Sequence, residues 1–210
     1  AIQKAVALSP DVERFKKGLA EFSQESAKDQ FSVDLPAPST DVSLSRDTGQ
    51  SRDDRKEIKI LVVTCEYQND LPVRKQREAL ANTFDFILEP PTFEDLVNQI
   101  KKFGKEHKIS RLVLIGHGAD KSGKEKSGIR WLNGNWVDSA IIAPFWTKAF
   151  VAGDSSTIDA FADNAEIISY NCFAGADSGL LEGMANLFLS FSGGTAYGSK
   201  GKVSPDLSIA

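Results

Sequence analysis

Two short stretches of the chain each place a reactive side chain directly after an apolar run. LVLIGHGAD (112–120) carries His117 between two glycines, and IISYNCFAGADSG (167–179) carries Cys172 before a series of small residues. A cysteine attacks a carbonyl group as a thiolate, so it needs a nearby base and partial exposure. His117 is the candidate base, and a Cys172–His117 pair is the first hypothesis for the chemistry of this chain.

The glycines near these two residues have their own chemical meaning. Acyl transfer develops a negative charge on the carbonyl oxygen, which backbone N–H groups stabilise where no side chain blocks approach. The N–H groups of Gly118 and Cys172 are therefore the proposed oxyanion hole. Gly175 would permit the tight turn into the next helix, whose N-terminal dipole favours negative charge near the sulfur.

The two stretches resemble the active-site blocks of the caspase-like cysteine peptidases, which include caspases, metacaspases, legumains, gingipains, separases and the self-cleaving protease domains of bacterial toxins. In these enzymes one apolar strand ends in His-Gly and a later one ends in the nucleophilic Cys, followed by small residues and Gly. Cys172 follows His117 by 55 residues, and caspases separate the two by about 50. The resemblance covers roughly residues 57–200 in element order, with motif-level similarity in these two stretches only.

The resemblance implies a function and a set of roles. His117 would be the general base or acid, Cys172 the nucleophile of a thiol protease, and Gly118 an oxyanion donor, with no metal or organic cofactor needed. Caspases have Gln-Ala where this chain has Tyr170 and Asn171. Metacaspases usually have an acidic residue at the position of Tyr170, so the resemblance does not support Arg/Lys specificity from this source. Tyr170, Asn171 and Asp177 are the residues expected to contact the substrate.

The elements around these stretches predict an α/β fold, a three-layer sandwich with a mostly parallel sheet and helices on both faces. Nearly continuous apolar runs are typical of buried parallel strands. Such runs, or shorter ones, predict strands at 57–65, 85–90, 110–118, 165–172 and 193–199. Helices are expected at 71–84, 92–107 and 179–191, a hairpin at 128–140, and helical or loop segments at 141–150 and 156–163.

Three of the predicted strands end at or beside a residue that could take part in catalysis. Cys65, His117 and Cys172 each end a separate predicted strand, and ligands of open parallel sheets bind outside the carboxyl ends of the strands. We therefore expect the three residues at one edge of the sheet. Cys65 is interpreted as a packing residue, because TCEYQND offers neither a glycine turn nor a helix start beside the thiol.

The chain divides into two parts at about residue 56. Residues 1–56 are expected to form a short amphipathic helix and then a Ser/Asp/Pro/Arg-rich arm or linker. A long surface loop over the domain is an equal alternative for the arm. Residues 57–210 are the predicted peptidase domain. An exposed arm tethered to a protease is an easy target, so autocatalytic cleavage within 1–56 is a further expectation.

Composition excludes several classes of function. A formal net charge of −4 argues against a nucleic acid or an anionic membrane as partner. No apolar run approaches the roughly 20 residues that span a bilayer, and the first residues lack the pattern of a signal peptide. Two cysteines and two histidines are too few for a disulfide framework or a zinc cluster. A reducing, cytoplasmic location is the expectation.

Other interpretations of the same residues stay open. Cys172 would also fit a buried packing residue and His117 a structural histidine. The loop 118–128 is either a solvated connection or a lid, and its lysines Lys121, Lys124 and Lys126 would suit a small anionic activator. Asp154, Asp159 and Asp163 would line a pocket for a basic side chain or serve as caps and turns.

The preferred function is a cysteine endopeptidase acting on a protein or peptide substrate. A catalytically inactive caspase-like module that binds proteins is one alternative, and a Cys172-dependent hydrolase of a non-peptide ester or amide is another.

Overall fold

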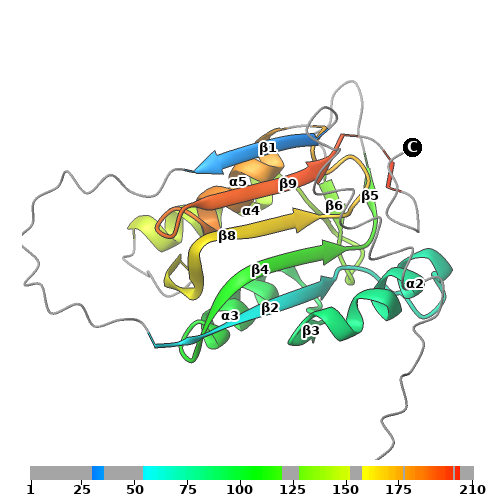
Figure 1. Ribbon diagram of the computed structural model, residues 1–210. Helices are drawn as coiled ribbons and strands as arrows, with labels where there is room; N and C mark the ends of the chain where they lie inside the picture. The colour runs from blue at the N-terminus through cyan, green and yellow to red at the C-terminus, as the bar shows by residue number, and fades with distance from the viewer. Residues whose placement is uncertain are drawn as a thin grey trace, which may run out of the picture.

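A six-stranded sheet, in the order β1-β9-β8-β4-β2-β3, organises the chain (Figure 1). The computed structural model describes residues 30–35, 54–119, 128–151, 158–176, 178–200 and 202–203. The strands are β1 (Gln30–Leu35), β2 (Lys56–Val63), β3 (Phe86–Leu88), β4 (His107–Ile115), β8 (Phe161–Ser169) and β9 (Gly194–Ser199). All neighbouring pairs are parallel except β1 with β9, which is antiparallel.

The central strands are buried on both faces, which explains their continuous apolar runs. Because successive side chains of a strand point to opposite faces, Ile60 and Val62 join one core cluster and Leu61 and Val63 the other. The free energy of burial therefore stabilises both faces of β2 at once.

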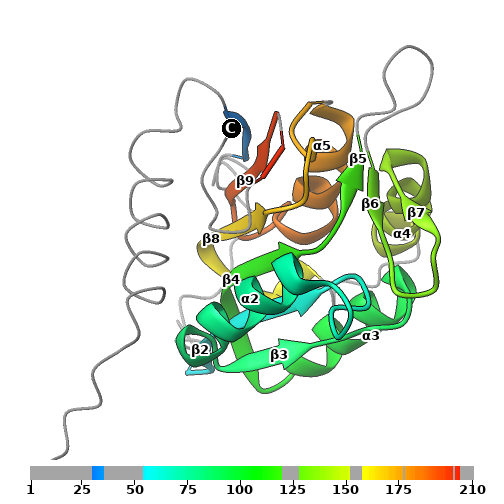
Figure 2. The same ribbon diagram turned by 90° about the vertical axis from the view of Figure 1, so that its right-hand side faces the viewer.

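Helices lie on both faces of the sheet (Figure 2). On one face, α2 (Leu71–Leu80) contributes Val73 and Leu80 to a core cluster. The larger cluster on the other face includes residues of α3 (Phe93–Phe103), α4 (Ser139–Val151) and α5 (Ser178–Phe188). Two 3₁₀ turns, η1 (Ala81–Thr83) and η2 (Ile158–Ala160), complete the helical elements. The predicted α/β class, with a parallel sheet flanked by helices, is thus confirmed.

Two helices begin at residues whose side chains cap them. The hydroxyl of Thr92 accepts a hydrogen bond from the Asp95 amide (3.1 Å), and the Asp95 carboxylate accepts one from the Thr92 amide (3.1 Å), which is a capping box. Asp70 caps α2 by accepting from the Val73 amide at 3.3 Å. This cap fixes the Asp70 carboxylate at the carboxyl edge of the sheet.

A second, three-stranded sheet follows β4. It consists of β5 (Gly118–Ala119), β6 (Gly128–Arg130) and β7 (Trp136–Val137), and β6 and β7 form the predicted hairpin. Gly134 adopts a φ of 81° in its turn. The lysines proposed to bind an anionic activator lie outside the described residues.

Two predictions about segment boundaries were wrong. Residues 30–35, which the sequence placed at the end of the amphipathic segment and the start of the arm, form β1 and pair with β9 through backbone hydrogen bonds. The other residues of the predicted arm, up to 53, lie outside the described part. Strand β8 begins at Phe161, inside a segment expected to be helix or loop, because Phe161 already pairs with Ile109 of β4.

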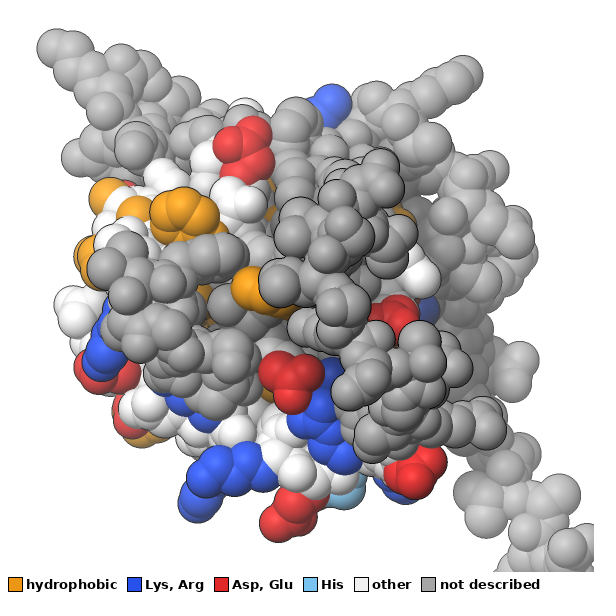
Figure 3. All heavy atoms as spheres, turned by 90° about the vertical axis from the view of Figure 1, so that its left-hand side faces the viewer, with side chains coloured by type: hydrophobic (Ala, Val, Ile, Leu, Met, Phe, Trp, Pro, Cys, Tyr) orange, Lys and Arg blue, Asp and Glu red, His pale blue; other side chains and the backbone are white. Residues whose placement is uncertain are grey.

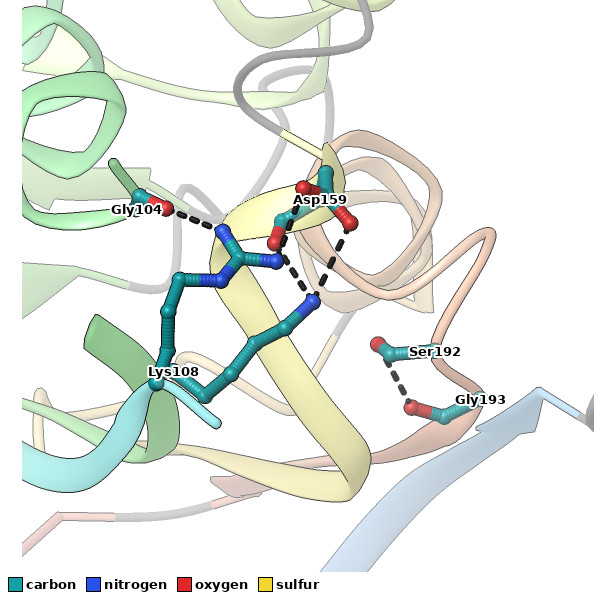
Figure 4. A network of polar contacts seen from close by, with 6 residues as sticks. Gly104, Lys108, Asp159, Ser192 and Gly193 are labelled. Carbon is teal, nitrogen blue, oxygen red and sulfur yellow. Dashed lines mark hydrogen bonds and ion pairs between the residues drawn. The ribbon is translucent and has the colours of Figure 1, made fainter. Parts of the chain in front are cut away.

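The amino ends of the parallel strands form a face on which acidic and basic side chains are interspersed (Figure 3). Here Asp159 is paired with Arg55 at 2.9 Å and with Lys108 at 3.1 Å (Figure 4). Arg55 also donates to the carbonyl of Gly104. Asp159 therefore joins strand starts at the edge opposite to His117, which argues against the pocket alternative for this residue.

Candidate active site

Three neighbouring strands end beside one another at the carboxyl edge of the sheet (Figure 2). Cys65 follows β2, His117 follows β4, and Cys172 follows β8. Parallel pairing joins β4 to both of the other strands, with Ile115 opposite Val63 and Leu114 opposite Ser169. The prediction that these strand ends share one edge is confirmed.

Gly118 packs directly against the backbone of Cys172. A Cβ atom added to Gly118 would overlap the carbonyl oxygen of Cys172 and would lie 3.0 Å from its nitrogen. The glycine is therefore required by the close approach of two strand ends, a reason that sequence reasoning did not give. It brings the residue after His117 into contact with the candidate nucleophile.

The pairing of β5 with β6 leaves the amide of Gly118 without a hydrogen bond to β6. The amide of Arg130 donates to the carbonyl of His117 at 2.9 Å, which makes Gly118 and Ile129 a non-hydrogen-bonded pair of the antiparallel ladder. Strand β6 therefore does not use the N–H of Gly118, and this donor is free of that strand for another acceptor.

His117 is oriented by a carboxylate that the sequence did not reveal. Its Nε2 is hydrogen-bonded to Oδ2 of Asp70, while Oδ1 of Asp70 accepts from the Val73 amide at the start of α2. The imidazole is 48% exposed and the carboxylate 19%. The available signal was an Asp two residues before Pro72 at a helix start, which indicates an N-cap near the strand end.

Cys65 lies next to this pair. Its sulfur, a carboxylate oxygen of Asp70 and a ring nitrogen of His117 all lie within 4.8 Å of one another. Burial, and then the charge of Asp70, raise the pKa of the Cys65 thiol to about 11, although a hydrogen bond from the His117 backbone opposes this. A neutral buried thiol is a poor nucleophile, which agrees with the packing role predicted for Cys65.

Cys172 sits at a bend in the chain. The side chain is partly exposed, and the amide of Val203 donates to its sulfur at 3.3 Å. The next residue, Phe173, has a φ of 58°, a left-handed conformation that bulky residues rarely adopt. Within the described residues the hydrogen bonds of the Cys172 sulfur are with Val203, and none joins it to the His117 ring.

Asn171 and Tyr170 are buried in the free protein, which argues against the predicted contact of their side chains with the substrate. Asn171 is 0% exposed, accepts from the hydroxyl of Ser169 at 2.9 Å, and donates to the carbonyl of His117 at 3.3 Å and to the hydroxyl of Thr64 at 3.4 Å. It therefore links the ends of β8, β4 and β2. Tyr170 is 2% exposed, and burial raises the pKa of its phenol.

Two further predictions concern the turn after Cys172. Asp177 lies outside the described residues. Gly175 does not need a glycine-only φ, but a Cβ atom there would overlap the carbonyl oxygen of Gly198. Its amide donates to the carbonyl of Ser199 at 2.8 Å. The glycine therefore allows the turn to pack against β9.

Comparison of the chain with protein-family models gives no match, and comparisons with curated proteins and with solved structures give none either. Within the described residues no helix is both long and apolar enough to cross a membrane.

Proposed function

We propose that the chain is a cysteine endopeptidase in which Cys172 is the nucleophile and His117 the general acid and base. The observation that carries the proposal is the packing of Gly118 on the backbone of Cys172. This contact puts Gly118, the residue after His117, against the backbone of Cys172 at one edge of the sheet. Ligands of parallel sheets bind at this edge.

The contact between Asp70 and His117 gives the imidazole a defined chemical role. With Nε2 bonded to the carboxylate, Nδ1 is the nitrogen left to accept a proton, and the carboxylate stabilises the imidazolium that forms. The thiol proton moves to Nδ1, the thiolate adds to the scissile carbonyl, and His117 then protonates the leaving amine. Water hydrolyses the thioester and restores the thiol.

Substrate binding has to complete this arrangement. Hydrogen bonds between catalytic groups often form only in the complex with substrate, and in the free protein the Cys172 sulfur bonds instead to the backbone of Val203. The amide of Gly118, which β6 does not use, is the proposed donor to the oxyanion. A peptide that displaces the Val203 contact would free the sulfur to face His117.

A second candidate function is a protein-binding module without catalysis. The absence, within the described residues, of a hydrogen bond from the Cys172 sulfur to the His117 ring favours this alternative. A hydrolase of non-peptide esters or amides would use the same chemistry and differ only in substrate.

Self-cleavage within residues 1–56 and a reducing, cytoplasmic location belong to the proposal. Strand β1 attaches part of the N-terminal segment to β9, which raises the effective concentration of nearby peptide bonds. Both cysteines of the chain are free thiols, as is usual in a reducing compartment.

Covalent labelling tests the proposal. Thiol-reactive acyl-peptide probes with different terminal residues should label the wild-type chain at Cys172, and Cys172→Ala and His117→Ala should abolish the label. Cys65→Ala removes the other thiol and is the matched control, which should keep it. Labelling that persists in Cys172→Ala would refute the assignment, and labelling no faster than that of a free thiol would support the binding module. A parallel panel of ester and amide substrates separates a peptidase from another hydrolase.

A further inference from the structure

Three side chains of metal-binding type converge beside the proposed catalytic residues. A sulfur from Cys65, a carboxylate oxygen from Asp70 and a ring nitrogen from His117 lie within 4.8 Å of one another. Zinc binds such donors at about 2.0–2.3 Å in a tetrahedron, which places the ligand atoms roughly 3.5 Å apart. Small shifts of side chains would therefore close the three groups around one ion.

We propose that Cys65, Asp70 and His117 form a site for a thiophilic divalent metal of the Zn²⁺ type, and that the bound ion inhibits the protein by holding His117. The inhibitory part rests on the proposed peptidase function, whereas binding itself does not. Counting cysteines and histidines excluded a zinc cluster at the sequence level, because that count omits the carboxylate of Asp70.

The charges and protons balance in this site. As the ion binds Nε2 of His117, the proton of that nitrogen moves through solvent to Nδ1, so that the imidazole stays neutral, and the Cys65 thiol releases its proton to solvent as the sulfur binds. One thiolate and one carboxylate then neutralise a divalent cation. The imidazole is 48% exposed, so the ion has a route of entry, and a water molecule can take the fourth position.

Surrounding groups already orient two of the ligands. The second oxygen of Asp70 accepts from the Val73 amide, and Asn171 donates to the carbonyl of His117. Outer contacts of this kind fix ligand orientation in metal sites and contribute to affinity. Three ligands from two strand ends and one helix start thus form a site that needs little rearrangement.

Titration of the full chain with Co²⁺ tests the site without any measurement of activity. A bound cobalt ion with a thiolate ligand gives a near-ultraviolet charge-transfer band, and Zn²⁺ should compete it away. The band should vanish in Cys65→Val and persist in Cys172→Ala. Asp70→Asn keeps a side chain that can cap α2 but removes a charged ligand. Co²⁺ binding should weaken at least about tenfold, because even the loss of an outer contact lowers metal affinity about 10–100-fold.

The outcomes separate the two proposals. A band that survives Cys65→Val but disappears in Cys172→Ala, or no band in the wild type, overturns the metal site. If Cys65→Val does not fold, as judged by circular dichroism, Cys65→Ser provides the same test.

A second experiment tests inhibition. Zn²⁺ should suppress labelling of Cys172 by the acyl-peptide probe at least tenfold in the wild type, and a chelator should restore it. Loss of this suppression in Cys65→Val supports the mechanism, and suppression equal to the wild type overturns it. If the wild type is not labelled at all, the peptidase proposal fails while the Co²⁺ test still decides the site.

Discussion

Replacing Asn171 with alanine should destabilise the fold by about 3 kcal/mol, because this side chain links the ends of three strands. The 2.9 Å bond from the Ser169 hydroxyl is the strongest contact, and its loss leaves a hydroxyl that is 0% exposed without its partner, at about 1–2 kcal/mol. The bonds to Thr64 (3.4 Å) and His117 (3.3 Å) are long and add about 1 kcal/mol together. The space left by the amide accounts for the remainder, of order 0.5–1 kcal/mol.

Urea unfolding followed by circular dichroism measures this effect. The midpoint should fall while the m-value stays constant, which indicates a change in stability rather than in the unfolded state. Asn98→Ala is the matched control, since Asn98 is exposed in α3 and alanine favours a helix, so its stability should be unchanged or slightly higher. A loss below about 1 kcal/mol in Asn171→Ala would refute the view that this amide holds the strand ends together.

Three other predictions follow from single contacts. Gly118→Ala forces a methyl group into the backbone of Cys172 and should lower the stability measured by urea unfolding by about 2 kcal/mol or more. At the control position Gly183 an added Cβ atom has its nearest contact at 3.4 Å, so Gly183→Ala should be neutral or stabilising. Equal changes in stability for the two variants would contradict the packing argument. Because the pKa of Cys65 is raised from 9.0 to about 11, its native thiol stays neutral where the unfolded one ionises. Stability should therefore fall between pH 9 and pH 11 by roughly 2 kcal/mol more than in Cys65→Val, and parallel pH profiles of the two proteins would disprove this. Thr92→Ala removes the capping box of α3 and should lower the stability measured by thermal unfolding by about 1 kcal/mol, and an unchanged melting temperature would count against the cap.

Sequence reasoning was sufficient for features set by local pattern. The apolar runs of β2, β4 and β8 predicted buried parallel strands because both faces of each strand are covered. Thr92 lies directly before an amphipathic segment, the position from which a threonine caps a helix, and it caps α3. The common edge for Cys65, His117 and Cys172 followed from the rule that parallel strands present their carboxyl ends together.

Features that depend on packing between distant segments were missed. The contact between Asp70 and His117 exists because α2 begins close to the end of β4, and no sequence spacing encodes that placement. Tyr170 and Asn171 adjoin Cys172 in sequence, but both are buried at the end of β8, so their position beside Cys172 in the chain was a poor guide to their exposure. Strand β1 was missed because its partner, β9, lies far along the chain.

The rate at which a thiol-reactive acyl-peptide probe labels Cys172 at neutral pH, measured by peptide mass spectrometry in the wild type and in His117→Ala, tests the central claim most directly, because the peptide occupies the place of the substrate. If His117 takes the proton of this thiol, the substitution should slow labelling of Cys172 at least about tenfold. Cys65, buried and neutral, is the internal reference and should react slowly in both proteins. Equal rates for Cys172 with and without the imidazole would contradict the account.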